Sequence, residues 1–117
     1  MVILTDRFID ELDKIADYIA FDSEWRAAEF VKGAKAACAG LDFMPYKFRK
    51  SLKFDDENVR DFVFKGYVLP YRVETLGNGT NVYMLGIYKE NAWEKGWNSR
   101  NLNNPRIFLR VAKKGNL

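Results

Sequence analysis

The sequence predicts an α+β fold in which an N-terminal strand and an antiparallel helical hairpin pack on an antiparallel β-sheet meander. Up to Pro45, apolar residues recur at three- and four-residue steps, which is the period of amphipathic helices. After Pro45, the pattern changes to apolar runs of strand length separated by turn sequences that contain glycine. A chain of 117 residues, 48% of them hydrophobic, fits one compact domain over residues 1–117.

The first helix is predicted over residues 6–20, after a short apolar segment from Val2 to Thr5. Its apolar positions are Phe8, Ile9, Leu12, Ile15, Ala16 and Ile19, with charged residues between them. Thr5 or Asp6 can cap this helix, because a side-chain oxygen there accepts a backbone N–H that has no partner inside the helix.

A second helix is predicted over residues 24–41, with Asp22 or Ser23 as its cap. Its apolar face steps by four and three residues through Ala27, Val31, Ala34, Cys38 and Leu41. Helices joined by so short a connection pack as an antiparallel hairpin. Cys38 lies within the apolar stripe, so we expect it to be a buried apolar side chain.

Three strands are predicted in hairpin order, over residues 58–64, 67–75 and 81–88. Their connections, "KG" and "LGNGT", supply the glycine or asparagine that positive backbone angles require. The strands are too apolar for a sheet with one face in water, and the helical hairpin can cover only one face. We therefore expect the C-terminal segment, a partner protein, or both to cover the other face.

Pro70 lies in the middle strand of this order but has no N–H to donate. A regular position there would leave a neighbouring carbonyl unpaired, at a cost of about 1–3 kcal/mol if it is buried. We expect Pro70 at a bulge, at a site without hydrogen bonds, or where one neighbouring strand has ended. If its strand is regular, Tyr67, Leu69, Tyr71 and Val73 share one face.

The composition excludes several kinds of site. With no histidine and one cysteine, the chain can form neither an internal disulfide nor a zinc site, and we expect no cofactor. No apolar run approaches the ~20 residues that cross a bilayer, and the N-terminus lacks a signal-peptide pattern. The sequence therefore predicts a cytoplasmic protein without a membrane partner. The acids Asp55, Asp56 and Glu57 in "FDDEN" are interpreted as a solvated turn rather than a metal site.

Charge is distributed unevenly along the chain. Residues 1–46 hold nine acidic and five basic side chains, a net charge of −4, whereas residues 47–117 hold seven acidic and fourteen basic ones, a net charge of +7. Such asymmetry suits a nucleic acid or an acidic protein partner, although a solvated, uneven surface explains it as well. The candidates for contacts with a target or a nucleic acid are Lys47, Arg49, Lys50, Lys53, Arg60 and Arg72.

The plainer alternative gives these cations structural roles. Arg60 and Arg72 can pair with Asp61, Glu74 or other carboxylates across the sheet, and the run from Lys47 to Lys53 can be a solvated loop.

Three segments of the chain together form a recognisable pattern: "DELDKIADYIAFDSEWRAAEFV", "GLDFMP" and "VRDFVFKGYVLPYRVE". They resemble, in this order, the first two helices, the exit from the second helix and the central hairpin of the RelE/ParE superfamily, the small toxins of bacterial type II toxin–antitoxin modules. The resemblance covers residues 2–90 and leaves 91–117 as a C-terminal extension. It implies a toxin that a cognate antitoxin protein neutralises.

The superfamily contains two mechanisms. RelE-like members cut messenger RNA in the ribosomal A site with basic residues of the meander, whereas ParE-like members inhibit DNA gyrase and are not nucleases. The arginine that comes after the turn in the ribonuclease pattern falls here on Val68, two further basic positions fall near Val59 and Asp61, and a late arginine falls near Glu90. The chain therefore resembles ParE more closely.

Two alternatives stay open at this point. One is a divergent ribosome-dependent mRNA endonuclease with Arg60, Tyr88 and Lys89 as catalytic candidates. The other is an orphan binding module that kept the fold and lost the target. In the extension, Trp93 and Trp97 either pack on the sheet or contact a partner.

Overall fold

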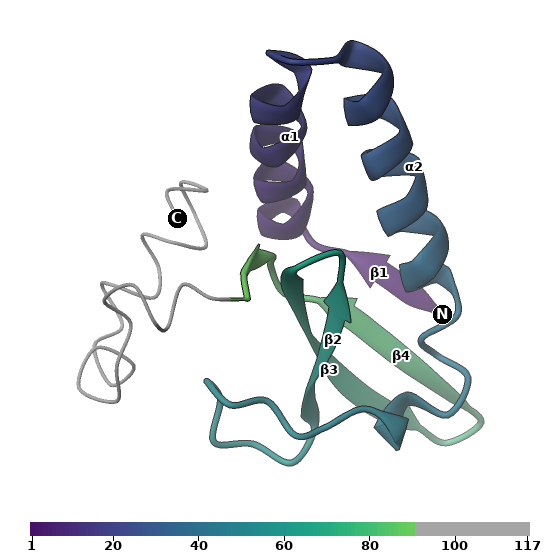
Figure 1. Cartoon of the computed structure of the whole chain (residues 1–117). Helices are drawn as coiled ribbons and strands as arrows, with labels where there is room; N and C mark the ends of the chain where they lie inside the picture. Colours follow the sequence, from purple (N-terminus) through teal and green to yellow (C-terminus); the bar gives the residue numbers. More distant parts are fainter. Residues whose placement is uncertain (91–117) are drawn as a thin grey trace.

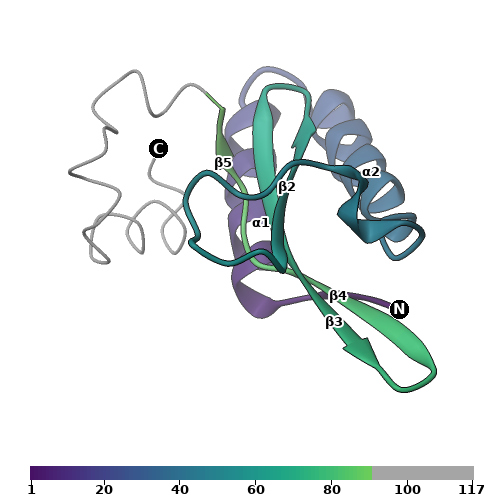
Figure 2. The same ribbon diagram turned by 90° about the horizontal axis from the view of Figure 1, so that it is seen from below.

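The computed structural model describes residues 1–90. Its elements are β1 (Val2–Leu4), α1 (Asp6–Ala20), α2 (Glu24–Ala39), the short 3₁₀ helix η1 (Pro45–Lys47), β2 (Val59–Phe64), β3 (Tyr67–Leu76), β4 (Gly79–Met84) and β5 (Tyr88–Lys89). The two helices form an antiparallel hairpin on one face of a twisted sheet (Figure 1 and, from below, Figure 2). The predicted α+β class is confirmed.

The sheet is mixed rather than wholly antiparallel. Its order is β1-β4-β3-β2, and β5 also pairs with β3. Strands β2, β3 and β4 form the predicted antiparallel meander, while β1 runs parallel to β4 with Val2 opposite Val82. The single third strand predicted over residues 81–88 is wrong, because β4 ends at Met84 and β5 begins at Tyr88.

Local signals fix the helix starts. The Thr5 hydroxyl oxygen accepts the Phe8 N–H at 3.2 Å, and the Ser23 hydroxyl oxygen accepts the Arg26 N–H at 3.1 Å. Helix α1 has the predicted bounds, whereas α2 ends at Ala39, before the predicted end at residue 41.

One apolar core joins the helical hairpin to the sheet. It contains Phe8, Leu12, Ile15, Phe30, Ala34, Cys38, Leu41, Leu69, Tyr71, Val73, Val82, Met84 and Ile87. The Phe30 ring of α2 packs against Phe64 and Tyr67, with ring centroids 5.6 and 5.5 Å apart. Cys38 is buried, as predicted.

The ladder between β3 and β2 passes Pro70 without interruption. Pro70 lies opposite Asp61, and the Val73 N–H donates to the Asn58 carbonyl at 2.7 Å. Because hydrogen-bonded and non-bonded pairs alternate in an antiparallel ladder, counting back from that bond makes Asp61 and Pro70 a non-bonded pair. The missing N–H of Pro70 therefore costs nothing on the β2 side.

On the other side of β3, the partner strand is interrupted at Pro70. The ladder to β4 ends where Tyr71 faces Met84, and Val68 faces Tyr88 of β5. We call the residues between these two pairs, Leu85, Gly86 and Ile87, the strand break. The strand break has one residue more than the stretch of β3 that it faces, Leu69 and Pro70. The Leu85 N–H donates to the Pro70 carbonyl at 2.9 Å, and proline can donate no bond in return.

The expectation for Pro70 is confirmed, and the bulge lies in the partner strand. Strand β3 itself stays regular, since Leu69, Tyr71 and Val73 belong to the core and Tyr67 packs against it.

Candidate functional site

The basic run lies in the loop of residues 47–58, which we call the basic loop. It runs beside the outer edge of β2, where the Asp61 N–H donates to the Arg49 carbonyl at 3.1 Å and the Ser51 N–H to the Val59 carbonyl at 2.8 Å. After Ser51, the loop residues Leu52 and Lys53 reach the sheet face away from the helices, where the Lys53 ammonium lies over the Tyr88 ring. Among residues 1–90, the basic loop therefore covers part of the face for which we expected the C-terminal segment or a partner. The extension, with Trp93 and Trp97, lies outside the described residues.

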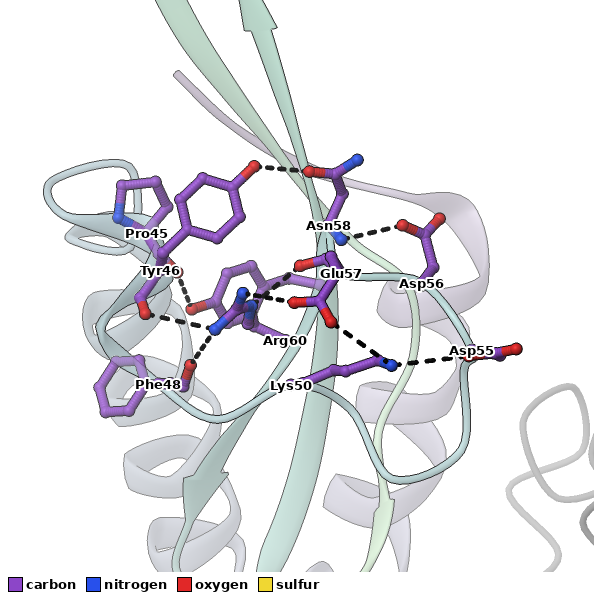
Figure 3. A network of polar contacts seen from close by, with 10 residues as sticks. Pro45, Tyr46, Phe48, Lys50, Asp55, Asp56, Glu57, Asn58 and Arg60 are labelled. Atoms are coloured by element: carbon purple, nitrogen blue, oxygen red, sulfur yellow. Dashed lines mark hydrogen bonds and ion pairs between the residues drawn. The ribbon is translucent and has the colours of Figure 1, made fainter.

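Arg60 holds the two ends of this loop together. Its guanidinium donates to the Glu57 carbonyl at 3.0 Å, to the Phe48 carbonyl at 3.1 Å and to the Tyr46 carbonyl at 3.4 Å (Figure 3). It also contacts the Glu57 carboxylate at 3.4 Å and lies 4.8 Å from the centroid of the Tyr46 ring. With its side chain 17% exposed, Arg60 is enclosed by the loop it orders.

Acidic residues of the same loop pair with two other candidate cations, Lys50 and Arg72. Lys50 lies 3.5 Å from Asp55 and 3.6 Å from Glu57 (Figure 3), and Arg72 lies 3.0 Å from Asp56. The Asn58 backbone N–H and, next, Arg72 lower the pKa of Asp56. The "FDDEN" turn thus supplies counter-charges for Lys50 and Arg72, a role that the interpretation as a solvated turn did not include. Exposed pairs of this kind stabilise a fold little, but they reduce the net positive charge presented to a polyanion.

Lys47 contacts an aromatic ring rather than an acid. Its ammonium lies 5.1 Å from the centroid of the neighbouring Phe48 ring, and the described residues place no carboxylate within ion-pair distance of it.

A pocket of about 230 Å³ opens on the sheet face away from the helices. It is lined by Arg49, Leu52, Lys53, Val68, Tyr88 and Glu90. The Lys53 ammonium lies 4.2 Å from the centroid of the Tyr88 ring. Burial lowers the pKa of Lys53 to about 8, although nearby Asp61 opposes this shift, and burial raises the pKa of Tyr88. The pocket thus holds an amine whose pKa burial lowers toward the physiological range.

Asp61 lies beside this pocket with its carboxylate fully buried. Its Oδ2 accepts the Leu52 N–H at 3.2 Å and lies 3.5 Å from Arg49, while Oδ1 has no hydrogen-bond partner within residues 1–90. The sequence suggested Asp61 only as a partner for Arg60 or Arg72. Its place between Val59 and Val63, on one face of an apolar strand, was the signal that could have identified it.

The family model described as "ParE toxin of type II toxin-antitoxin system, parDE" matches residues 2–89. The chain belongs to the ParE toxin family. The match runs from β1 to the end of β5, so it includes the helical hairpin, the meander and the basic loop. A comparison with curated proteins gave no match. As a ParE-family toxin of a type II system, the chain has an antitoxin as its partner.

In this ParE-family chain, the three nuclease candidates do not converge. Tyr88 faces Val68 on the side of the pocket, whereas Lys89 lies on the opposite face, its ammonium 5.2 Å from the centroid of the Tyr67 ring. Arg60 is enclosed by the basic loop. Groups that transfer protons in one reaction must reach the same substrate atoms, whereas Tyr88 and Lys89 lie on opposite faces of the sheet and Arg60 is held by carbonyl groups of the basic loop and η1.

Among the described residues of the ParE-family chain, no helix is long and apolar enough to cross a membrane. Within the same part of the chain, no group of histidine, cysteine and acidic side chains could hold a metal ion.

Proposed function

We propose that this ParE-family toxin stops growth by inhibiting DNA gyrase in the cytoplasm, and that it is not a nuclease. The family match over residues 2–89 carries the proposal. The arrangement of Arg60, Tyr88 and Lys89 supports it, because these side chains do not meet at one centre. The pairing of Lys50 and Arg72 with acids of the basic loop supports it further, since a messenger RNA ligand that used these two cations would have to displace those carboxylates.

Induced expression of the full chain is expected to cause filamentation and a DNA-damage response while bulk messenger RNA stays intact. Purified chain should inhibit DNA supercoiling by gyrase in the same concentration range in which it binds the enzyme. A frame-shifted gene is the control. Rapid transcript cleavage at ribosome-bound codons would overturn the proposal in favour of the endonuclease, and an absence of any growth effect would favour the orphan module.

We further propose that the antitoxin docks on the sheet face away from the helices. Apolar Leu52 and Val63 are 61% and 41% exposed there, close to the cationic side chains Arg49 and Lys53 of the pocket. This combination fits a segment that carries both apolar and acidic side chains.

Co-expression with the adjacent small gene is expected to give a complex that survives purification and protects β2 and β3 amides from hydrogen exchange. The double variant Arg49→Glu, Val63→Glu should weaken that complex at least 10-fold, which is about 1.4 kcal/mol. The matched control is Trp25→Ser, a 70% exposed position on α2 away from the sheet face. Salt-labile binding without protection of the meander would count against this mode.

A further inference from the structure

Helix α1 carries a buried carboxylate that contacts the strand break. Glu11 is 0% exposed, and its Oε1 accepts the Ile87 N–H at 2.9 Å. A Cβ on Gly86 would lie 2.7 Å from the same oxygen, so the backbone of the strand break approaches the carboxylate as closely as a glycine allows. Oε2 has no hydrogen-bond partner among residues 1–90.

Few groups compensate a negative charge at this position. From α1, Arg7 and Lys14 favour the ionised form and Asp10 opposes it, and Lys14 also pairs with Asp10 at 3.1 Å. The strand break contributes a single backbone N–H. Burial outweighs these contacts and raises the pKa of Glu11 to about 7.

The contact between Glu11 and Ile87 also positions β5. Tyr88 lies directly after the strand break and lines the pocket, and Lys89 pairs with Tyr67 of β3. The residue directly before β5 is thus bonded through its N–H to a side chain of α1.

We propose that Glu11 is a proton-dependent contact that holds the strand break and β5 against α1. As a neutral acid it accepts the Ile87 N–H without a buried charge. On ionisation, the bond from the Ile87 N–H persists, but a charge then lies in the core and Oε2 is buried without a donor from residues 1–90. Opening of the strand break, which lets water reach the carboxylate, therefore becomes more favourable. Raising the pH through neutrality thus loosens β5 and, with it, the Tyr88 side of the pocket.

Glu11 makes the folded chain more stable at low pH than at high pH, because its pKa is raised in the folded state. The pKa of Glu11 in the folded chain lies above its ordinary value of 4.5, so its contribution to stability is complete below pH 4.5. That contribution is lost as the pH rises through about 7. Between pH 4.5 and about pH 7, ionisation of Glu11 should raise the unfolding equilibrium constant roughly 100-fold.

The proposal is tested by NMR on the full chain from pH 4 to pH 9. The ¹³C shift of the Glu11 carboxyl is expected to titrate with a midpoint near pH 7. Amide exchange of Ile87 and Tyr88, corrected for its intrinsic pH dependence, should become faster with the same midpoint. Glu11→Gln keeps an oxygen acceptor for Ile87 but cannot ionise, so the ~100-fold change in unfolding should disappear.

The matched control is Asp13→Asn, an exposed carboxylate on the same helix, which should leave that change in place. A Glu11 carboxyl that titrates near 4.5 would overturn the proposal, and so would unaltered pH dependence in Glu11→Gln. If Glu11→Gln does not fold, the titration of the unmodified chain decides the question by itself.

Discussion

Replacing Arg60 with alanine is expected to lower the free energy of unfolding by about 3 kcal/mol. The guanidinium donates to the carbonyl groups of Tyr46, Phe48 and Glu57, and its removal deletes the three bonds that hold the two ends of the basic loop together beside β2. Arg60→Lys should recover little of the loss, because an ammonium cannot reproduce the planar set of donors. Urea denaturation of the purified variants measures the effect.

The matched control is Arg72→Ala. Arg72 pairs with Asp56 at 3.0 Å, but its side chain is 47% exposed, so its removal should cost less than about 1 kcal/mol. Equal losses from the two arginines would show that Arg60 is not the residue that orders the loop. A loss of growth inhibition in Arg72→Ala with normal stability would assign Arg72 to target binding.

Gly86→Ala is expected to lower the free energy of unfolding by about 2 kcal/mol. The added methyl group would lie 2.7 Å from Glu11 Oε1, and that oxygen is held in the core by its bond to the Ile87 N–H. The carboxylate cannot move away without breaking this bond, so the strand break must shift instead. Chemical denaturation at a fixed pH measures the loss.

Two further variants test the cause of that loss. Gly79→Ala, at a position where a Cβ meets nothing within 4 Å, is the control and should change stability little. In a Glu11→Ala background, Gly86→Ala should cost at least about 1 kcal/mol less than alone, because the atom it collides with is gone. Strictly additive effects of the two substitutions would show that Glu11 and the strand break are not coupled.

The helices could be predicted from the sequence because their signals are local. A 3.6-residue period and the capping side chains Thr5 and Ser23 act within one or two turns, and α1 has the predicted bounds. The β2–β3 hairpin could be predicted for the same reason, since the two-residue Lys65-Gly66 turn, where both residues have positive φ, is a local signal.

The sequence predicted only part of the interruption in the predicted third strand. Pro70 indicated that pairing must lapse beside it, because the missing donor is a property of the residue itself. The sequence could not show which strand would bulge. Residues 82–87, "VYMLGI", are almost entirely apolar and carry no signal that separates the end of β4 from the start of β5. No local pattern records the contact of the strand break with Glu11, which is distant in sequence and accepts the Ile87 N–H across the core.

The sequence by itself determined the α+β class, the order of the elements and the family, since these depend on periodicity, turn residues and motif spacing. It also supplied the basic run, but not the partners of its members. Only the tertiary structure decided that Arg60 orders the basic loop, that Lys50 and Arg72 pair with acids of that loop, and that Asp61 is buried beside the pocket. The physical reason is that charge pairing and burial depend on distances between segments, which the path of the basic loop around β2 sets and no local pattern records.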